Sequence, residues 1–385
     1  MGPPCLRLSA REQQRPVADM MPSSHDFKHV LSRDGGRKNG VTLQALTPCF
    51  YSNKRIDRMT RVARWWSAAC CAAGVAAGSY AQSASQDLPQ IFAPGVVSGV
   101  ANEDSAAFMP DGDTVFFDRI SWPNAAILVS HRAHGGWSAP VIAPFSGQWL
   151  DHDPAMAPDG SFIVFSSNRP DTDGGKALDA VMANGKVAIG SGGHLWRVER
   201  KGSGWGKPWL LPDPVNSSSR TYAPSVVADG SVYFQRPGSD GDFRLFRSQY
   251  RNGKYEAPIE VPLGDAAAHK LDPAVAPDES FIVFDANFGG KDDPDRLYIS
   301  FRDGDGWSAP VDLGKDINVK SPWGSHLGPD HRTLYFSSTR SVPVHYPRTP
   351  EQAAQDIVRM QAWDNGSDNI WSVSLAPWLD AHRGG

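Results

Sequence analysis

The sequence has 385 residues, a net charge of −4 at pH 7, and 40% hydrophobic residues that include 13 Trp and 17 Phe. This length allows one large domain or two ordinary ones, and the aromatic content is enough for a packed core. The charge excludes the strongly basic composition of nucleic-acid-binding domains, and the 37 Gly and 31 Pro favour frequent turns over long helices.

Residues 59–81 predict a Sec-type signal peptide. The segment begins at Met59, where a start codon should stand, and has a basic stretch, a short apolar run and a small-x-small cleavage site that ends at Ala81. Residues 1–58 are polar and lack periodicity, so we expect a disordered, non-native upstream extension. A mature protein of residues 82–385 would be a single domain, periplasmic or secreted, without a transmembrane segment. The alternative is a genuine cytosolic head followed by a buried Ala-rich helix.

All four cysteines precede the predicted cleavage site, at Cys5, Cys49, Cys70 and Cys71. A mature chain cut after Ala81 therefore has no thiol. This excludes a disulfide framework, a thiolate metal site and a cysteine nucleophile in that chain.

A hairpin motif occurs five times along residues 105–340. Each copy has a short apolar strand, a turn of the Pro/Ala-Asp-Gly type, and a second strand of β-branched and aromatic residues. The turn aspartates are Asp111, Asp159, Asp229, Asp278 and Asp330. A third strand follows each hairpin, and an aromatic-x-x-Pro strand follows four of them. Four strands per unit of about 50 residues predict the blades of a β-propeller.

The outer strands predict how the ring closes. The fifth copy ends at the strand 369–375, after which no aromatic-x-x-Pro unit occurs. Residues 90–98 align with an outer strand and its exit, so we expect them to pair with 369–375 and hide the sheet edges. The predicted fold class is all-β, a five-bladed β-propeller of four-stranded antiparallel blades closed by an N-terminal outer strand. The alternatives are a sixth blade hidden in the insertions 171–193 or 341–368, and a β-sandwich.

The repeated unit resembles the propeller repeats of TolB-type bacterial envelope proteins. The likeness rests on DPAMAPDGSFIVFSSNRP at 153–170 and GWSAPVDLGKDIN at 306–318, and its copies cover 91–375. Three turns depart from the pattern, at Ala228, Glu279 and His331. The resemblance implies a TolB-like, WD-repeat-like propeller and little about function, because the repeat marks an architecture. TolB itself is not expected, since there is no room for the α/β domain that precedes its propeller.

One face of the predicted ring collects the starts of the inner strands, the loops after the second strands, and both insertions, so we expect a ligand to bind there. The predicted ligand-binding residues are Asp118, Arg119, Asp151, Asp153, Asn168, Arg169, Arg236, Arg340 and Trp323. The arginines have two interpretations. They form a partial ring that binds an anion, or they pair with acidic residues such as Asp153 and Asp272 and join neighbouring blades. Trp137, Trp205 and Trp307 recur with the repeat and are expected to pack between blades.

Two histidines near the channel are candidates for chemistry. His152 stands between Asp151 and Asp153, but neighbouring strand residues point to opposite faces, so these three are not expected to converge on one ion. His326 occupies a position where the other copies have Ala or Ser. With Asp272, the two histidines would form an acid/base or divalent-metal site. A hydrogen-bonding role for His326 is the alternative.

These features favour a non-catalytic binding or protein-interaction module of the cell envelope, with an envelope protein or an anionic saccharide or peptide as partner. The alternative is a propeller-type lyase or hydrolase that acts on an anionic saccharide at the channel mouth, with His152, Asp272 and His326 as catalytic residues. No cofactor is predicted beyond a divalent metal in the channel, and nucleic acid is not expected as a partner.

Overall fold

The computed structural model describes residues 88–290 and 293–383. They belong to one compact unit that spans 82–385. The predicted upstream extension, the predicted signal peptide and the four cysteines lie outside the described residues. Within the described ranges, no helix is long and apolar enough to cross a membrane.

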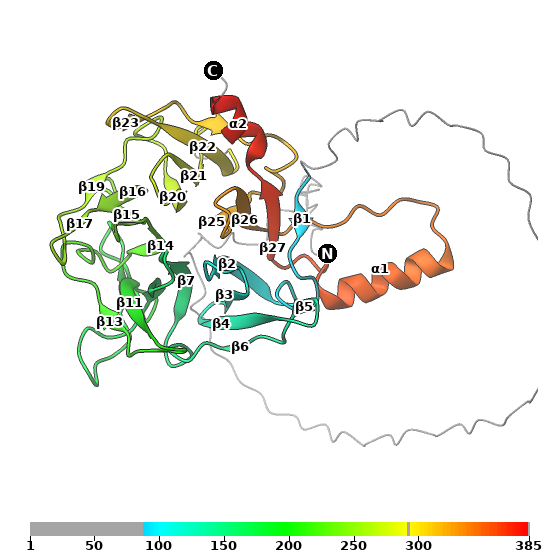
Figure 1. Ribbon diagram of the computed structural model, residues 1–385, viewed down its shortest axis with the longest axis horizontal. Helices are drawn as coiled ribbons and strands as arrows, with labels where there is room; N and C mark the ends of the chain where they lie inside the picture. The colour runs from blue at the N-terminus through cyan, green and yellow to red at the C-terminus, as the bar shows by residue number, and fades with distance from the viewer. Residues whose placement is uncertain (1–87, 291–292, 384–385) are drawn as a thin grey trace, which may run out of the picture. The chain divides into compact units, whose positions relative to one another are not determined.

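Five antiparallel sheets lie around a common axis and form a five-bladed β-propeller (Figure 1). Blade 1 contains β2 (Asn102–Phe108), β3 (Thr114–Ser121), β4 (Asn124–Ala133), β5 (Gly136–Trp137) and β6 (Val141–Ile142). Blade 2 contains β7 (Asp151–Met156), β8 (Phe162–Ser167), β11 (His194–Lys201), β12 (Gly204–Trp205) and β13 (Trp209–Leu210). Blade 3 contains β14 (Tyr222–Val226), β15 (Val232–Pro237), β16 (Phe243–Ser248) and β19 (Ile259–Glu260), with the hairpin β17 (Tyr250–Arg251) and β18 (Lys254–Tyr255). Blade 4 contains β20 (Lys270–Val275), β21 (Phe281–Ala286), β22 (Arg296–Asp303), β23 (Gly306–Trp307) and β24 (Val311–Asp312). Blade 5 contains β25 (Trp323–Leu327), β26 (Thr333–Ser338), β27 (Asn369–Ser374) and β1 (Gln90–Ile91).

The N-terminal strand β1 completes blade 5, as the outer strands predicted. It pairs antiparallel with β27, with Gln90 opposite Ser372 and Ile91 opposite Trp371. The five-bladed, all-β fold is therefore confirmed, and the six-bladed and sandwich alternatives are wrong.

Both insertions are fully described, and neither contains a further blade. Residues 171–193 form the hairpin β9 (Ala180–Val181) and β10 (Val187–Ala188). Residues 341–368 contain the helix α1 (Pro350–Ala362), which the sequence reasoning did not predict. A second helix, α2 (Ala376–Arg383), follows β27.

The repeat turns form because the turn aspartate accepts a backbone hydrogen bond from two residues further on. Asp159 Oδ1 accepts from the N–H of Ser161 at 2.9 Å, and the same bond occurs in all five blades. The residue after the aspartate has a positive φ, 71° at Gly160. Glu279 and His331 adopt φ of 58° and 52° in the two copies without Gly. The departures from the repeat therefore change the residue and keep the shape of the turn.

The apolar core lies between neighbouring blades. A cluster of buried aliphatic and aromatic side chains occupies each of the five boundaries, including the one between blades 5 and 1. Trp137, Trp205 and Trp307 pack against three of these clusters, as predicted. Contact between blades therefore supplies most of the hydrophobic stabilisation of the ring.

Candidate functional site

Each inner strand has a β-bulge at an equivalent position near the axis. The bulge residues with positive φ are Ser105, Asp153, Ala223, Asp272 and Gly324. The pairing register with the second strand shifts beside each of them. A bulge interrupts the alternation of side chains, so two neighbouring residues can face the same side.

Backbone N–H groups of the bulges join blades 2 to 5 to the blade that precedes each of them. The donor and acceptor pairs are Asp153 N to Asp118 Oδ2 (2.7 Å), Ala223 N to Asp153 Oδ2 (3.0 Å), Asp272 N to Gln235 Oε1 (2.8 Å) and Gly324 N to Asp272 Oδ2 (2.9 Å). At the boundary of blades 5 and 1, the Ser337 hydroxyl donates to Asp104 Oδ1 at 2.8 Å. We call these residues the latch ring, since their buried polar side chains bind neighbouring blades together.

Asp118, His152 and Asp153 converge at the boundary of blades 1 and 2. Their ligand-type atoms lie within 4.8 Å of one another, and His152 Nδ1 lies 2.9 Å from Asp153 Oδ2. Asp151, His152 and Asp153 do not all converge, as expected, but alternation does not keep His152 and Asp153 apart, because the bulge at Asp153, with φ 50°, breaks it. Asp151 does not join them, since its carboxylate pairs with Arg169 at 3.0 Å.

Burial and neighbouring charges shift the pKa values of the carboxyl groups in and around this cluster in opposite directions. Burial, followed by the charge of Asp118, raises the pKa of Asp104 well above its usual range. Burial and the charge of Asp153 raise the pKa of Asp118 to about 7. Burial would also raise the pKa of Asp153, but the charge of His152 and its hydrogen bond lower it to about 2. Burial disfavours the imidazolium, yet Asp153 raises the pKa of His152 overall.

The predicted catalytic set of His152, Asp272 and His326 is divided among different contacts. His152 contacts Asp153, and Asp272 accepts from the N–H of Gly324. His326 Nε2 lies 3.1 Å from the carbonyl oxygen of Pro154, and burial lowers the pKa of the ring. These contacts place His326 in a hydrogen-bonding role, which was the alternative interpretation to a catalytic role.

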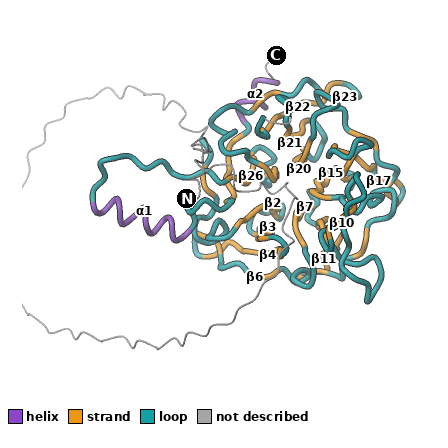
Figure 2. The backbone as a smooth tube through the Cα atoms, turned by 180° about the vertical axis from the view of Figure 1, so that it is seen from behind, coloured by secondary structure: helices purple, strands orange, loops and turns teal. Residues whose placement is uncertain are grey.

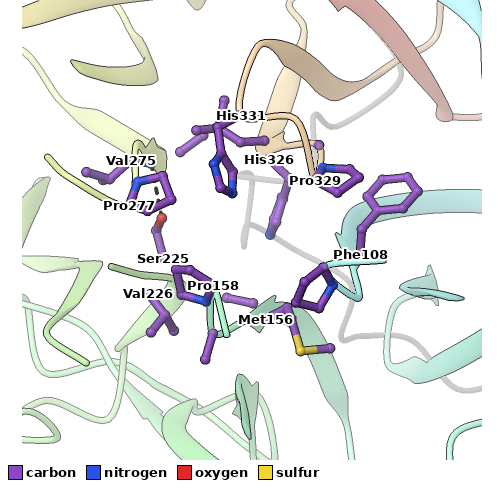
Figure 3. Close-up of a pocket in the computed structure, with 16 residues that line it drawn as sticks. Phe108, Met156, Pro158, Ser225, Val226, Val275, Pro277, His326, Pro329 and His331 are labelled. Carbon is purple, nitrogen blue, oxygen red and sulfur yellow. Dashed lines mark hydrogen bonds between the residues drawn. The ribbon is translucent and has the colours of Figure 1, made fainter. Parts of the chain in front are cut away.

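His326 faces a cavity of about 70 Å³ at the end of the axis where the repeat turns meet (Figure 3). Its lining includes the turn residues Pro158, Pro277 and Pro329, and a second histidine, His331. None of the described residues that line this cavity is a carboxylate. The cavity therefore has no acid/base pair of the kind that glycoside hydrolysis uses.

The four predicted arginines make contacts within the fold. Arg119 pairs with Glu103 at 2.8 Å, Arg169 pairs with Asp151, Arg236 donates to Ser217 Oγ at 2.6 Å, and Arg340 donates to the carbonyl oxygens of Asp316 and Ile317 at 2.6 and 3.1 Å. The expected partners Asp153 and Asp272 bind backbone N–H groups of the next blade instead. The guanidinium groups thus fix their own blade and the loops that enter it.

Asn168 and Trp323 also contact neighbouring segments. Asn168 Oδ1 accepts from the N–H of Leu150 at 2.9 Å, and its Nδ2 donates to the carbonyl oxygen of Gly190 at 2.7 Å. Trp323 Nε1 donates to Asp368 Oδ1 at 3.3 Å. Of the predicted ligand-binding residues, most are thus committed to internal contacts.

Two aromatic residues that were not among the predicted site residues cover His152. The ring centroids of Trp122 and Tyr222 lie 5.7 Å and 5.8 Å from that of His152. Trp122 is 38% exposed, whereas Tyr222 is buried. Trp122 lies in the turn between β3 and β4 of blade 1 and does not recur with the repeat, so the repeated pattern gave no signal for it.

The insertion 341–368, here called the arm, extends α1 away from the five sheets (Figures 1 and 2). Thr349 caps the helix: its hydroxyl accepts from the N–H of Gln352, the Gln352 side chain accepts from the N–H of Thr349, and Pro350 follows at the first position. None of the residues of α1 is buried. The arm therefore has a defined helix whose surface is open to solvent.

The charged residues of the arm largely pair with one another. Asp356 pairs with Arg348 at 2.6 Å and with Arg359 at 2.9 Å, and Arg359 also pairs with Asp364 at 2.7 Å. The exposed large apolar residues of the arm are Val342, Val344, Tyr346, Ile357, Val358 and Met360. The arm therefore exposes several large apolar side chains among its uncharged polar ones.

The sequence matches no known protein family, and no curated protein matches it. Among solved structures, it is similar to a TolB described as putative from Agrobacterium tumefaciens, with 17% identity over 62% of this chain and 70% of the other and a TM-score of 0.40. TolB from Acinetobacter baumannii has 13% identity over 66% of this chain and 58% of the other, with a TM-score of 0.40. An α-L-arabinofuranosidase from Lactobacillus brevis has 11% identity over 74% of this chain and 92% of the other, with a TM-score of 0.43. TolB proteins are thus among the similar structures, and so is a hydrolase.

Proposed function

We propose that this protein is a non-catalytic interaction module of the bacterial cell envelope, which binds a protein partner through the arm. The observation that carries the proposal is the exposed apolar surface of the arm, formed by a helix in which no residue is buried. Placement in the periplasm or outside the cell rests on the predicted signal peptide at 59–81.

The contacts near the axis support the non-catalytic side of this proposal. Asp153 and Asp272 bind backbone groups of the next blade, and Asp118 is only 1% exposed. A general acid or base must reach the substrate proton, directly or through one water. The arginines likewise bind loop carbonyl groups and carboxylates, which weakens the case for an anionic saccharide as the ligand.

A groove beside α1 supplies a place for a partner's apolar side chain. It has a volume of about 450 Å³ and is lined by Pro94, Ala354, Gln355, Val358, Arg359, Ala362 and Trp363. Trp363 is one of its fixed lining residues, because it is 8% exposed and packs in the core between blades 4 and 5. A largely apolar groove beside an exposed helix suits a short hydrophobic segment of another protein.

Site-specific photocrosslinking of the full chain in bacterial cells tests the proposal. A photoreactive phenylalanine analogue replaces Val358, which is 65% exposed, and in a second protein replaces Ile259, which is 76% exposed on blade 3. We expect a defined crosslinked product from position 358 and none from position 259. Adding Asp in place of Met360 should remove that product, because a charge would have to be desolvated in the apolar contact. Equal products from both positions, or none from position 358, would contradict the proposal.

A further inference from the structure

The latch ring accounts for the backbone contacts of Asp118 and Asp153, but neither the repeat nor partner binding through the arm explains why His152 converges with them. We propose that these three residues bind one divalent transition-metal cation, represented by Zn²⁺, which joins blade 1 to blade 2. Asp118 comes from β3 of blade 1, whereas His152 and Asp153 come from β7 of blade 2.

The spacing of the ligand atoms suits a small cation. Zn–N and Zn–O bonds are about 2.0–2.2 Å, so two ligands at an angle of about 90–109° lie about 2.9–3.4 Å apart. His152 Nδ1 and Asp153 Oδ2 are 2.9 Å apart, and the ligand atoms of the three residues all lie within 4.8 Å. Only a small inward shift of Asp118 would therefore complete a three-ligand set.

Two buried atoms of the cluster have no hydrogen-bond partner among the described residues: His152 Nε2 and Asp118 Oδ1. His152 is 5% exposed and Asp118 is 1% exposed, so bulk water does not reach them freely. Buried polar atoms nearly always have a partner, and each exception calls for an explanation. A cation, with water in its remaining coordination positions, would supply the missing partner of Asp118 Oδ1. His152 would bind it through Nδ1, so Nε2 would stay outside the coordination shell.

The surrounding charges favour a cation at this place. The carboxyl groups of Asp104, Asp118, Asp153 and Asp272 repel one another when ionised, and the neighbouring His152 opposes this repulsion at Asp118. In a buried, weakly screened position such like-charge repulsion is strong. A dication would replace it with attraction.

The backbone already positions two of the three ligands. Asp153 N–H donates to Asp118 Oδ2 at 2.7 Å, which ties the two carboxylates together. Asp153 Oδ2 also accepts from the Ala223 N–H and the Ser166 hydroxyl, each at 3.0 Å. Such supporting hydrogen bonds orient ligands around metal sites and contribute to affinity.

The donor set indicates the class of metal. An imidazole nitrogen with carboxylate oxygens suits Zn²⁺ and neighbouring transition metals, whereas Ca²⁺ and Mg²⁺ prefer oxygen ligands alone. Trp122 and Tyr222 cover the His152 ring, so the ion would be shielded from solvent. The role of such an ion would be to hold blades 1 and 2 together.

Calorimetric titration with Zn²⁺ tests the site in the full chain, purified without a histidine tag and stripped with EDTA. Cys5, Cys49, Cys70 and Cys71 are replaced by Ser so that thiolates do not compete. We expect one Zn²⁺ bound per chain, a higher midpoint of thermal unfolding at saturation, and much weaker binding of Ca²⁺. Failure to bind Zn²⁺, or tighter binding of Ca²⁺, would overturn the proposal.

Matched variants locate the ion. Asp118→Asn keeps an acceptor for the Asp153 N–H, and His152→Gln keeps a polar side chain. Each should still lower Zn²⁺ affinity by about 100-fold, because loss of a group that only supports a ligand already costs 10- to 100-fold. Asp285→Asn and His326→Gln remove a buried carboxyl group and a histidine elsewhere near the axis and should bind Zn²⁺ as the parent does. Unchanged affinity in both ligand variants would overturn the assignment.

X-ray absorption at the zinc edge of the parent protein gives a reading that does not depend on how the variants fold. One imidazole nitrogen with carboxylate oxygens is the expected first coordination shell. Two or more imidazole ligands would place the ion elsewhere and would also overturn the assignment.

Discussion

The latch ring and the arm reverse the usual distribution of polar and apolar side chains. Near the axis, carboxyl, amide and hydroxyl groups are buried and bind the next blade. In the arm, large apolar side chains are exposed while the charged ones pair among themselves. Polar groups buried with partners stabilise a specific arrangement, whereas exposed apolar groups mark a surface for association. The contrast thus distinguishes the latch ring, which stabilises the propeller, from the arm, which we propose binds a partner.

The largest expected effect lies beside the latch ring, at the buried ion pair of Asp151 and Arg169, whose side chains are 0% and 11% exposed. Asp151→Ala should lower the free energy of unfolding by about 3–5 kcal/mol, because it leaves a guanidinium buried without its counter-charge. Urea unfolding monitored by tryptophan fluorescence measures this change. Arg236→Ala is the control and should cost about 1 kcal/mol or less, since its side chain binds neutral groups nearer the surface. Equal losses would break the proposed contrast.

Gly324→Ala should have the next largest effect. Gly324 has φ 64°, and a Cβ atom there would overlap the carboxylate of Asp104. We expect a loss of about 2–4 kcal/mol, because the substitution adds a steric clash to backbone strain. Gly314→Ala is matched to it, since Gly314 has φ 90° but open space around its Cβ position. It should lose only about 1 kcal/mol, and an equal loss in the two variants would rule out the role given to Asp104.

The pH dependence of stability tests the buried carboxyl group of Asp285, which lies beside Asp272 of the latch ring. Burial, followed by the charges of Asp272 and Asp295, raises the pKa of Asp285 well above its usual range. The unfolded chain loses this proton above about pH 4 and the folded chain keeps it, so stability falls as pH rises above 4. Asp285→Asn should remove up to about 1.4 kcal/mol per pH unit of that slope. Urea unfolding between pH 5 and pH 8 in EDTA measures both slopes, and parallel slopes would contradict the prediction.

The smallest stability effect is expected in the arm. Val358→Asp and Met360→Asp should change the free energy of unfolding by less than about 0.5 kcal/mol, because both side chains are exposed, at 65% and 49%. Met360→Asp, combined with the photoreactive residue at position 358, should also lose the crosslinked partner. A loss of several kcal/mol would mean that the arm stabilises the propeller, and the contrast with the latch ring would fail.

The ring and its closure were predictable because they follow from repetition. Five similar hairpins fix the number of blades, and residues 90–98 align with an outer strand that the last copy lacks. The convergence of His152 and Asp153 was not predictable from alternation, since a bulge depends on how the chain pairs with its neighbours. The helix α1 did leave a signal, because Thr349 with Pro350 and Gln352 forms a capping box that could have been read from the sequence.

The pairing of β1 with β27 has a mechanical consequence. Two residue pairs, Gln90 with Ser372 and Ile91 with Trp371, connect parts of the chain that are about 280 residues apart. A force applied to the two ends of the propeller would act directly on this short junction, before it reached the longer strand pairs of blades 1 to 4. Blade 5 would therefore peel open first under tension, and the order of rupture in a single-molecule pulling experiment would begin at the place where the ring is closed.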